Sequence, residues 1–335
     1  MSRAAPFVLH WGIISTGGIA AAFVKDLVLP PEGRGVSDVS HAIVAVGSRS
    51  SDKAQQFIRE KCPEGGCAQK AGLSQTVPVA YGSYAEVYSD PEHLEELICN
   101  TILTQPACLN QAEFKVLSDF SKSKNLFLME AVWTRFFPLT FTLEKALFEQ
   151  QVIGEIRRLV SDFSIDFVDI VTEENRLLNI DLAGGGLLDL GPYPLFWALL
   201  LLYNHPENKQ TPPEKIQASM RKYERTGVDL HTSWTLDFPR IGKVGARAIL
   251  STSIGVNGCR DAVTRIQGTK GEIIMPWATA RPESFTIRHS KVGRGPQDYT
   301  EEVCKFPIQG TGLNWEADAI ARDIRGKPGT LDMDY

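Results

Sequence analysis

An aspartate and a tyrosine lie four residues apart, shortly after three consecutive glycines, within residues 184–194. If the chain is helical from Leu187 onward and Pro192 falls near the helix start, Asp189 and Tyr193 share one face of that helix. A tyrosine hydroxyl can exchange a proton with an alcohol or carbonyl oxygen, and a neighbouring carboxylate can hold or polarise that oxygen. A helix-capping aspartate and a core tyrosine would have the same spacing, so the residues alone leave both interpretations open.

A second group of small residues lies near the N-terminus, where an apolar stretch ends in a turn and a helical pattern begins. The turn is a relaxed form of the G-x-G-x-x-G/A motif, with serine at the first glycine position and alanine at the third. Its residues are Ser15, Thr16, Gly17, Gly18, Ile19 and Ala20. Such a turn lets backbone N–H groups at a helix N-terminus approach a pyrophosphate. An ordinary strand-to-helix turn is the alternative, because the motif alone is a weak signal.

The next apolar stretch ends in Ser48 and Arg49, where an NAD-binding unit usually carries a carboxylate for the ribose hydroxyls. A hydroxyl and a guanidinium suit the 2′-phosphate of NADP, because arginine binds a phosphate through two parallel charged hydrogen bonds. A solvated surface arginine is the alternative. Arg49 follows Gly17 by 32 residues, more than this motif usually has, and we attribute the excess to a turn-rich surface insertion at residues 30–35. We therefore expect NADP, in preference to NAD, as the cofactor.

Composition excludes several classes of function. The 335 residues carry a net charge of −5, which argues against nucleic acid or an anionic membrane as the main partner. The longest apolar run, residues 195–203, is too short to cross a bilayer. Of six cysteines only Cys62 and Cys67 lie close together, and no histidine spacing supports a metal site, so we expect none. Free thiols are typical of a reducing compartment, and we expect a cytoplasmic protein.

Hydrophobic periodicity predicts two kinds of architecture along the chain. The first third alternates predicted strands (9–15, 41–47 and 79–81) with predicted helices (19–27, 51–60, 84–99 and 111–122), which indicates a parallel sheet with crossover helices. Alternation at period two between residues 217 and 305 indicates an antiparallel sheet with one solvated or partner-covered face. A helix at 140–150 precedes that region, and a last helix is expected at 314–324. We place a domain boundary between residues 138 and 139.

Six segments, in this order, resemble the Gfo/Idh/MocA oxidoreductase family. They are most similar to its branch of dimeric dihydrodiol dehydrogenases and NADP-dependent D-xylose dehydrogenases. The segments span most of the chain and read WGIISTGGIA, VGSRSSDKAQQF, YGSYAEV, NLFLMEAVWTRFFP, GGGLLDLGPY and IQGTKGEI. The resemblance implies an α/β fold: a Rossmann-type, doubly wound parallel sheet in residues 1–138, then an α/β domain with an open, mainly antiparallel sheet in 139–335. It also implies a homodimer formed through that second sheet.

The resemblance assigns roles to particular residues. Asp189 and Tyr193 fall on the family's catalytic motif, and Trp133 falls on an aromatic residue that lines the active site, with Arg135 beside it. Cofactor-binding positions of the family coincide with Ser15, Gly17, Ile19, Ala20, Ser48 and Arg49, and Thr16 and Gly18 belong to the same turn.

The chain departs from the family pattern between residues 81 and 106. Relatives have a strand ending in Thr-Pro-His, then a helix, then a strand ending in Glu-Lys-Pro. Here one strand–helix unit is missing, and the last motif reads Thr104, Gln105 and Pro106. Gln105 therefore occupies the position of the lysine that the family uses for proton transfer. Because a glutamine does not ionise, Gln105 can orient a substrate oxygen but cannot act as an acid or a base.

Two functional hypotheses follow. The first is an NADP-dependent oxidoreductase that transfers hydride to or from a small cyclic alcohol, sugar or diol. In this reaction Tyr193 gives or takes the proton of the substrate hydroxyl, and Asp189 orients that hydroxyl. Gln105 orients a substrate oxygen, and Trp133 and Arg135 shape the substrate pocket. The alternative is a catalytically altered, non-redox descendant, either a small-molecule-binding regulator or a cyclase-like enzyme, or else a truncated inactive paralogue. Gln105 and the missing unit leave open whether the protein is a dehydrogenase.

Overall fold

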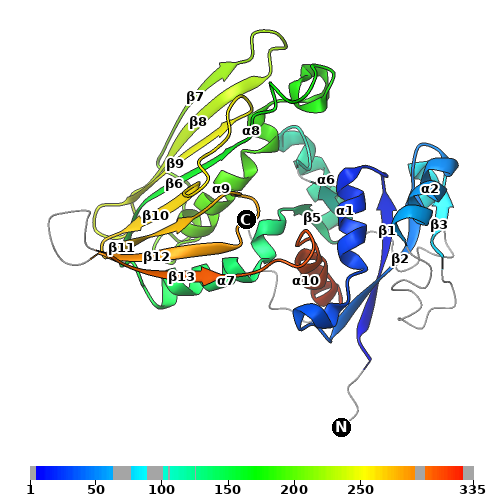
Figure 1. Cartoon of the computed structure of the whole chain (residues 1–335), viewed down its shortest axis with the longest axis horizontal. Coiled ribbons are helices and arrows are strands. Elements are labelled where there is room, and N and C mark those ends of the chain that lie inside the picture. The colour runs from blue at the N-terminus through cyan, green and yellow to red at the C-terminus, as the bar shows by residue number, and fades with distance from the viewer. Residues whose placement is uncertain are drawn as a thin grey trace. The chain divides into compact units, whose positions relative to one another are not determined.

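The computed structural model describes residues 5–62, 77–88, 101–104, 106–124, 126–290 and 299–326 (Figure 1). The chain divides into two compact units. The first comprises Met1–Leu103, Lys115–Phe136 and Ile308–Tyr335, and the second comprises Thr104–Phe114 and Phe137–Pro307. The C-terminal segment thus belongs with the N-terminal unit, and the linear boundary at residue 138 stays a prediction.

The first unit contains a parallel sheet, as its alternating pattern predicts. Strands β1 (Phe7–Ile14), β2 (Val39–Gly47) and β3 (Val79–Tyr81) pair in the order β1-β2-β3, and both pairings are parallel. Six of the nine β2 residues are buried hydrophobic side chains or glycine, which is typical of a strand covered on both faces. Helices α1 (Gly18–Leu27) and α2 (Ser51–Lys61) follow the first two strands, and α4 (Tyr84–Tyr88) follows the third.

A second, two-stranded sheet contains β4 (Thr101–Thr104) and β5 (Leu128–Ala131), with helix α6 (Gln111–Ser123) between them along the chain. Within the described ranges no strand pairs with the edge of β1 that faces away from β2. Gln105 and most of the helix predicted at 84–99 lie outside the described residues. The absence of a strand–helix unit therefore remains a prediction.

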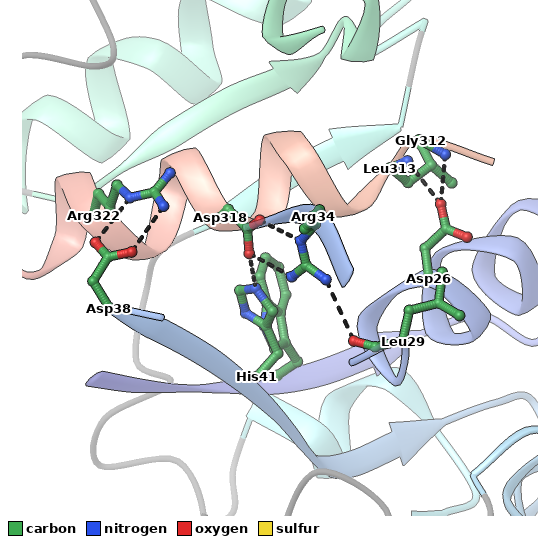
Figure 2. A network of polar contacts seen from close by, with 10 residues as sticks. Asp26, Leu29, Arg34, Asp38, His41, Gly312, Leu313, Asp318 and Arg322 are labelled. Carbon is green, nitrogen blue, oxygen red and sulfur yellow. Dashed lines mark hydrogen bonds and ion pairs between the residues drawn. The ribbon is translucent and has the colours of Figure 1, made fainter. Parts of the chain in front are cut away.

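Helix α10 (Asn314–Ile324) has the bounds predicted from the sequence, and its buried face packs into the core of the first unit. Three aspartates attach the surrounding segment to that unit (Figure 2). Asp26 of α1 accepts hydrogen bonds from the backbone N–H groups of Thr311, Gly312 and Leu313, at 2.7 to 2.9 Å.

The other two attachments involve Asp318 and Asp38. Asp318 of α10 binds Arg34 (Nε–Oδ2 2.6 Å) and His41 (Nε2–Oδ1 2.9 Å), and all three side chains are buried. Asp38 binds Arg322, with an Nε–Oδ2 distance of 3.0 Å. We predicted residues 30–35 as a surface insertion. The structure shows a 3-10 turn, η1 (Pro31–Arg34), whose arginine points inward, because its cation pairs with the buried carboxylate of Asp318.

The second unit is built on an eight-stranded sheet. Its strand order is β13-β12-β11-β10-β6-β9-β8-β7, and every neighbouring pair is antiparallel except β6 with β9. The sheet is thus mixed and mainly antiparallel, as predicted. The strands are β6 (Ile156–Ser164), β7 (Lys215–Lys222), β8 (Asp229–Phe238), β9 (Ala246–Ser253), β10 (Thr264–Gly268), β11 (Gly271–Met275), β12 (Ser284–Ser290) and β13 (Tyr299–Lys305).

Helices α8 (Gly186–Asp189) and α9 (Pro192–Ala198) pack on one face of this sheet, against β6, β8 and β9. Helix α9 continues into the π-helical η6 (Leu199–Tyr203). Helix α7 (Pro138–Glu144) and its π-helical extension η3 (Lys145–Glu149) precede β6 along the chain. Short 3-10 turns, η4 (Arg176–Leu178) and η5 (Ile180–Leu182), precede α8. Leu159 and Phe163 of β6 are buried on the helix side, whereas Arg158 points to the opposite, open face and is exposed.

One helical stretch among the described residues, Ile180–Tyr203, is long and apolar enough to cross a membrane by length and composition. However, 61% of its most apolar window is buried inside the protein. The core helix of a soluble protein passes the same test, so the stretch is weak evidence for a membrane span.

Candidate cofactor-binding and catalytic residues

The predicted cofactor turn follows directly on β1. Ser15 has a φ of 94°, a left-handed conformation that glycine adopts at no steric cost and other residues rarely adopt. Its backbone N–H donates to the carbonyl of Gly47 (2.9 Å), and its Oγ accepts from the N–H of Gly17 (3.3 Å). Ser15 therefore occupies the first glycine position of the motif in the strained conformation that the motif requires, and its hydroxyl closes the turn.

The next two residues begin α1. Gly17 is the N-cap of α1, with φ −79° and no side-chain capping bond, and Gly18 is its first residue. A Cβ atom at Gly18 would have no heavy atom within 4 Å, and one at Gly17 would meet only Ser15 Oγ at 3.6 Å. Neither glycine has a positive φ. Backbone conformation and internal packing therefore do not explain why glycine occupies positions 17 and 18. A pyrophosphate that approaches the N-terminus of α1 would fill the open space beside them. The turn fits a dinucleotide.

Ser48 and Arg49 lie beside this turn, because Ile14 and Gly47 are register partners in the parallel pair β1–β2. Ser48 is only 4% exposed, and its hydroxyl lies 3.3 Å from Thr16 Oγ1. The Ser48 N–H donates to the carbonyl of Tyr81 at 3.2 Å. Ser48 therefore connects the ends of the three parallel strands. Arg49 is exposed at the same edge. The structure thus brings the six turn residues together with Ser48 and Arg49. Within the turn, Ile19 is 63% exposed and Ala20 packs against the core.

Two of the three glycines of the second motif have a clear steric cause. A Cβ at Gly184 would lie 2.5 Å from the Arg176 carbonyl oxygen, and a Cβ at Gly185 would lie 2.0 Å from Asp229 Oδ1. Gly185 also has a φ of 121°. Asp229, in β8, accepts a hydrogen bond from the N–H of Leu187 at 2.7 Å, through Oδ2. The glycines therefore allow close contact with the protein's own backbone and with Asp229, and not with a ligand. The hydrogen bond from Leu187 N–H to Asp229 fixes the start of α8.

Asp189 and Tyr193 do not share one helix as predicted. Asp189 is the last residue of α8, and Tyr193 is the second residue of α9, since the regular helix is interrupted at Leu190 and Gly191. Both intervening residues keep right-handed helical dihedral angles, so the two side chains remain one turn apart. The interruption matches Pro192 at the first position of α9, where a proline needs no hydrogen-bond donor.

Both candidate catalytic side chains are half-buried and held by neighbours. Asp189 Oδ1 accepts a hydrogen bond from Arg176 at 2.5 Å. The Tyr193 ring lies edge-to-face against Phe163 of β6, with ring centroids 5.4 Å apart. Arg176 and Asp229 are positioning residues that sequence reasoning missed. No motif marks either residue, and each meets its partner only in the folded chain.

The remaining predicted residues lie elsewhere. Trp133 and Arg135 belong to the 3-10 turn η2 (Trp133–Phe136), in the first unit, and both are half-buried. Gln105 lies outside the described residues. In the part of the chain that the structure describes, no three His, Cys, Asp or Glu residues are grouped as a metal site would require.

Comparison with known proteins gives consistent results. Residues 141–274 match the family model of the GFO/IDH/MocA C-terminal domain. The chain is 35% identical to the D-xylose 1-dehydrogenase (NADP(+)) of Hypocrea jecorina, over 97% of this chain and 87% of that protein. It is 30% identical to the trans-1,2-dihydrobenzene-1,2-diol dehydrogenase of Xenopus laevis, over 92% and 87%.

Solved structures show the same fold. A 3-ketoreductase from Actinomadura kijaniata, in complex with NADP and TDP-benzene, superposes with a TM-score of 0.67 at 16% identity, covering 96% of this chain and 91% of that one. An aldose-aldose oxidoreductase from Caulobacter crescentus has a TM-score of 0.67 at 19% identity, covering 96% and 90%. The fold, the order of the motifs and the identity to full-length relatives lead to one conclusion: the chain belongs to the Gfo/Idh/MocA oxidoreductase family.

Proposed function

We propose that this protein is an NADP-dependent oxidoreductase that acts on a small sugar, diol or cyclic alcohol. The observation that carries the proposal is the open space at Gly17 and Gly18, at the N-terminus of α1, with Arg49 exposed at the same edge of the sheet. The names of the relatives support it, since they include a D-xylose dehydrogenase that uses NADP(+) and dihydrodiol dehydrogenases.

The proposed roles follow from the chemistry of each residue. Backbone N–H groups at the start of α1 bind the pyrophosphate, and the Arg49 guanidinium binds the 2′-phosphate through paired charged hydrogen bonds. When bound, the nicotinamide cofactor supplies or accepts the hydride. Tyr193 gives or takes the hydroxyl proton of the substrate, and Asp189, held by Arg176, keeps the polar groups of that site oriented. We assign Trp133 and Arg135 to the substrate pocket.

The cofactor assignment has a direct test. A ligand at 100 times its dissociation constant adds about 2.7 kcal/mol to the stability of the state it binds. NADPH should therefore raise the melting temperature by several degrees, and NADH should do so only at much higher concentration. Arg49→Ala should lower the affinity for NADPH and leave the affinity for NADH unchanged, whereas Lys61→Ala, an exposed cation at the far end of α2, should change neither. No stabilisation by millimolar NADPH would refute the proposal.

The catalytic assignment is tested at Tyr193. Tyr193→Phe removes only the hydroxyl and should lower kcat by about 10²- to 10⁴-fold, the usual contribution of a positioned acid or base. Tyr203→Phe, in η6 of the same unit, is the matched control and should leave kcat unchanged. Equal activity of wild type and Tyr193→Phe would remove Tyr193 from the mechanism.

The second candidate is a non-redox descendant of the family. Gln105 favours it, because a glutamine cannot transfer a proton at the position of the family's lysine. The edge strand β1 also favours it, because no described strand pairs with β1 on the side away from β2. Gln105→Lys separates the two candidates. An oxidoreductase that is slowed by one missing group should gain activity, and a repurposed pocket should not respond.

Two further properties belong to this proposal. A homodimer through the open face of the eight-stranded sheet is expected from the family resemblance. A cytoplasmic location is expected from the scattered cysteines, and cell fractionation tests it.

A further inference from the structure

The triple glycine before α8 holds a short turn that carries an arginine to the candidate site. The N–H of Gly184 donates to the carbonyl of Asn179, and the N–H of Gly185 donates to the carbonyl of Leu177, both at 2.9 Å. A Cβ atom at Gly184 would lie 2.5 Å from the carbonyl oxygen of Arg176 and 2.7 Å from that of Leu177. The backbone of η4 therefore packs directly on Gly184, and a side chain at that position would displace the turn.

Two asparagine side chains fix the same turn from within. Asn175 Oδ1 accepts a hydrogen bond from the N–H of Leu177 (3.0 Å) and caps η4. Asn179 Oδ1 accepts from the N–H of Asp181 (2.9 Å) and caps η5. The backbone of Arg176 is thus held by the glycines and by the capping amides. Because the turn is already ordered, a ligand that binds the Arg176 side chain has little backbone order left to impose.

The Arg176 guanidinium keeps most of its hydrogen-bonding capacity. A guanidinium has five N–H donors, and one of them, on Nη2, donates to Asp189 Oδ1 at 2.5 Å. Asp189 is the one acceptor that this guanidinium has among the described residues. The Arg176 side chain is 52% exposed, whereas that of Asp189 is 19% exposed. A half-exposed ion pair stabilises a fold little, so the pair is better suited to contacting a ligand than to holding the chain together.

Arg176 and Asp189 together present a donor and an acceptor side by side. A guanidinium only donates hydrogen bonds, and an ionised carboxylate only accepts them, at about four sites. A hydroxyl group does both, so one substrate hydroxyl can donate to Asp189 and accept from Arg176. A carbonyl oxygen has no proton to donate, and an ammonium group has no lone pair to offer. The pair therefore matches a neutral hydroxyl group.

Tyr193 lies within reach of the same substrate. It follows Asp189 by one helical turn, and side chains one turn apart have Cβ atoms about 5–6 Å apart. Its ring is held edge-to-face against Phe163, with the ring centroids 5.4 Å apart. A substrate whose reacting oxygen meets the Tyr193 hydroxyl can therefore bring the oxygen of its next carbon atom to the Arg176–Asp189 pair.

We propose that Arg176 is a substrate-binding residue which, together with Asp189, selects substrates that carry a hydroxyl group on the carbon next to the reacting one. The inference rests on the proposed function, because Tyr193 defines which substrate oxygen reacts. It deepens that function by giving Arg176 a role beyond holding Asp189 in place. A cyclic alcohol without the second hydroxyl group lacks this contact and is a poorer substrate.

Substrates with and without this hydroxyl group test the proposal. D-xylose and 2-deoxy-D-xylose differ only at carbon 2, and trans-cyclohexane-1,2-diol and cyclohexanol differ in the same way. Hydrogen bonds to charged groups should make kcat/KM of wild type about 10- to 100-fold higher for the hydroxylated compound of each pair. Arg176→Met removes every donor and keeps an unbranched side chain. It should lower kcat/KM by the same factor for the hydroxylated compounds and leave the deoxy compounds nearly unchanged.

This pattern separates substrate binding from a structural role. If Arg176 only holds Asp189 in place, Arg176→Met lowers kcat/KM equally for both members of each pair, which overturns the proposal. Arg176→Lys keeps a charge and N–H donors without the planar fork, and should restore part of the discrimination. Arg225→Met is the matched control, because Arg225 is a 69% exposed arginine of the same unit that pairs with Glu173. It should change kcat/KM for none of the four compounds, and thermal melting confirms that each variant is folded.

Ligand-observed NMR extends the test to a protein without turnover. A wild type that binds the hydroxylated compounds more tightly, and loses this preference in Arg176→Met, supports the proposal even where no hydride is transferred. That result would refute the oxidoreductase alone. A wild type that oxidises or binds both members of each pair equally, or that binds none of the four compounds, overturns the role of Arg176. NADPH binding then decides separately on the cofactor assignment.

Discussion

Gly185 and Gly18 are expected to respond differently to substitution by alanine. Gly185 has a positive φ, and a Cβ on it would lie 2.0 Å from Asp229 Oδ1. Gly185→Ala should therefore destabilise the protein by about 2 kcal/mol or more, from backbone strain and displacement of the aspartate. Gly18→Ala meets no atom within 4 Å and should leave the free energy of unfolding within about 0.5 kcal/mol of wild type. Urea denaturation of both variants measures the difference.

The Gly18→Ala variant also reports on the cofactor. If the space at Gly18 admits a pyrophosphate, the new methyl group should lower the affinity for NADPH by about tenfold or more while the fold stays intact. Lys25→Ala, an exposed residue in the last turn of α1, is the control and should bind NADPH as tightly as wild type. An alanine at position 18 that binds NADPH as tightly as wild type would show that the turn does not cradle the phosphates.

Glu316 predicts how stability depends on pH. It lies 1% exposed in the first turn of α10, and burial raises its pKa from 4.5 to about 8. Its Oε2 has no hydrogen-bond partner among the described residues. Below pH 4.5 the carboxyl group is protonated in both the folded and the unfolded state. As the pH rises from 4.5 to 8, only the unfolded state ionises, so stability falls by about 1.4 kcal/mol per pH unit.

Glu316→Gln should remove this dependence. The variant should be close to wild type at pH 5 and several kcal/mol more stable at pH 8, because the amide keeps the shape and does not ionise. Glu32→Gln, an exposed residue in η1, should follow wild type at every pH. The measurement is urea denaturation at several pH values. Parallel pH profiles for wild type and Glu316→Gln would show that Glu316 ionises normally in the folded protein.

Residues that belong to a local sequence motif could be predicted, and their partners from other parts of the chain could not. The glycines at 184–186 predicted a close approach because glycine tolerates one. The partner, Asp229, lies more than 40 residues away, and nothing in its neighbours marks it. Arg176, which binds Asp189, is likewise an ordinary arginine until the fold brings the two side chains together. Such partners depend on tertiary structure and not on local pattern.

Helix α10 is attached to the rest of its unit by long-range polar contacts. Asp318 is buried between Arg34 and His41, while Asp38 is 40% exposed where it binds Arg322 (Figure 2). Trp11 Nε1 donates to His41 Nδ1 (3.1 Å), so the His41 proton sits on Nε2 and faces Asp318. Burial lowers the pKa of His41 despite that carboxylate, and the ring is therefore neutral.

The two aspartates should differ in their effect on stability. Asp318→Ala leaves the Arg34 cation buried without its carboxylate and should cost about 3–5 kcal/mol. Asp38→Ala removes a half-exposed pair and should cost about 1 kcal/mol or less. Hydrogen exchange should show faster opening of α10 in Asp318→Ala than in Asp38→Ala. Equal costs would mean that the buried network contributes no more than the surface pair.

The elements themselves were largely predictable. The helical pattern at 314–324 predicted the bounds of α10, and period-two alternation predicted the second sheet, because both signals are local. The interruption between α8 and α9 was not predicted, since the chain keeps helical angles through Leu190 and Gly191 and only the hydrogen-bond pattern changes. The parallel pairing of β6 with β9 was also not predictable, because it joins strands that are distant along the chain.

At the scale of the whole molecule, the main question is whether the parallel sheet lacks a strand. The alignment with the Hypocrea jecorina relative runs over 362 residues, which exceeds the length of this chain by 27. That relative therefore has positions without a counterpart in this chain. In the described residues the three-stranded and the two-stranded sheets of this region are separate, as expected if the strand that joins them is missing.

Hydrogen exchange along β1 tests this interpretation. Successive N–H groups of a strand point to opposite neighbours, and those of Phe7 and Ser15 donate to the β2 side, to the carbonyls of Asp38 and Gly47. The N–H groups of Val8 and Ile14 therefore point toward the other edge. Without a neighbouring strand there, they should exchange about tenfold or more faster than those of Leu9 and Ser15, which face β2. Equal protection of both sets would mean that a strand pairs with this edge and that the sheet is continuous.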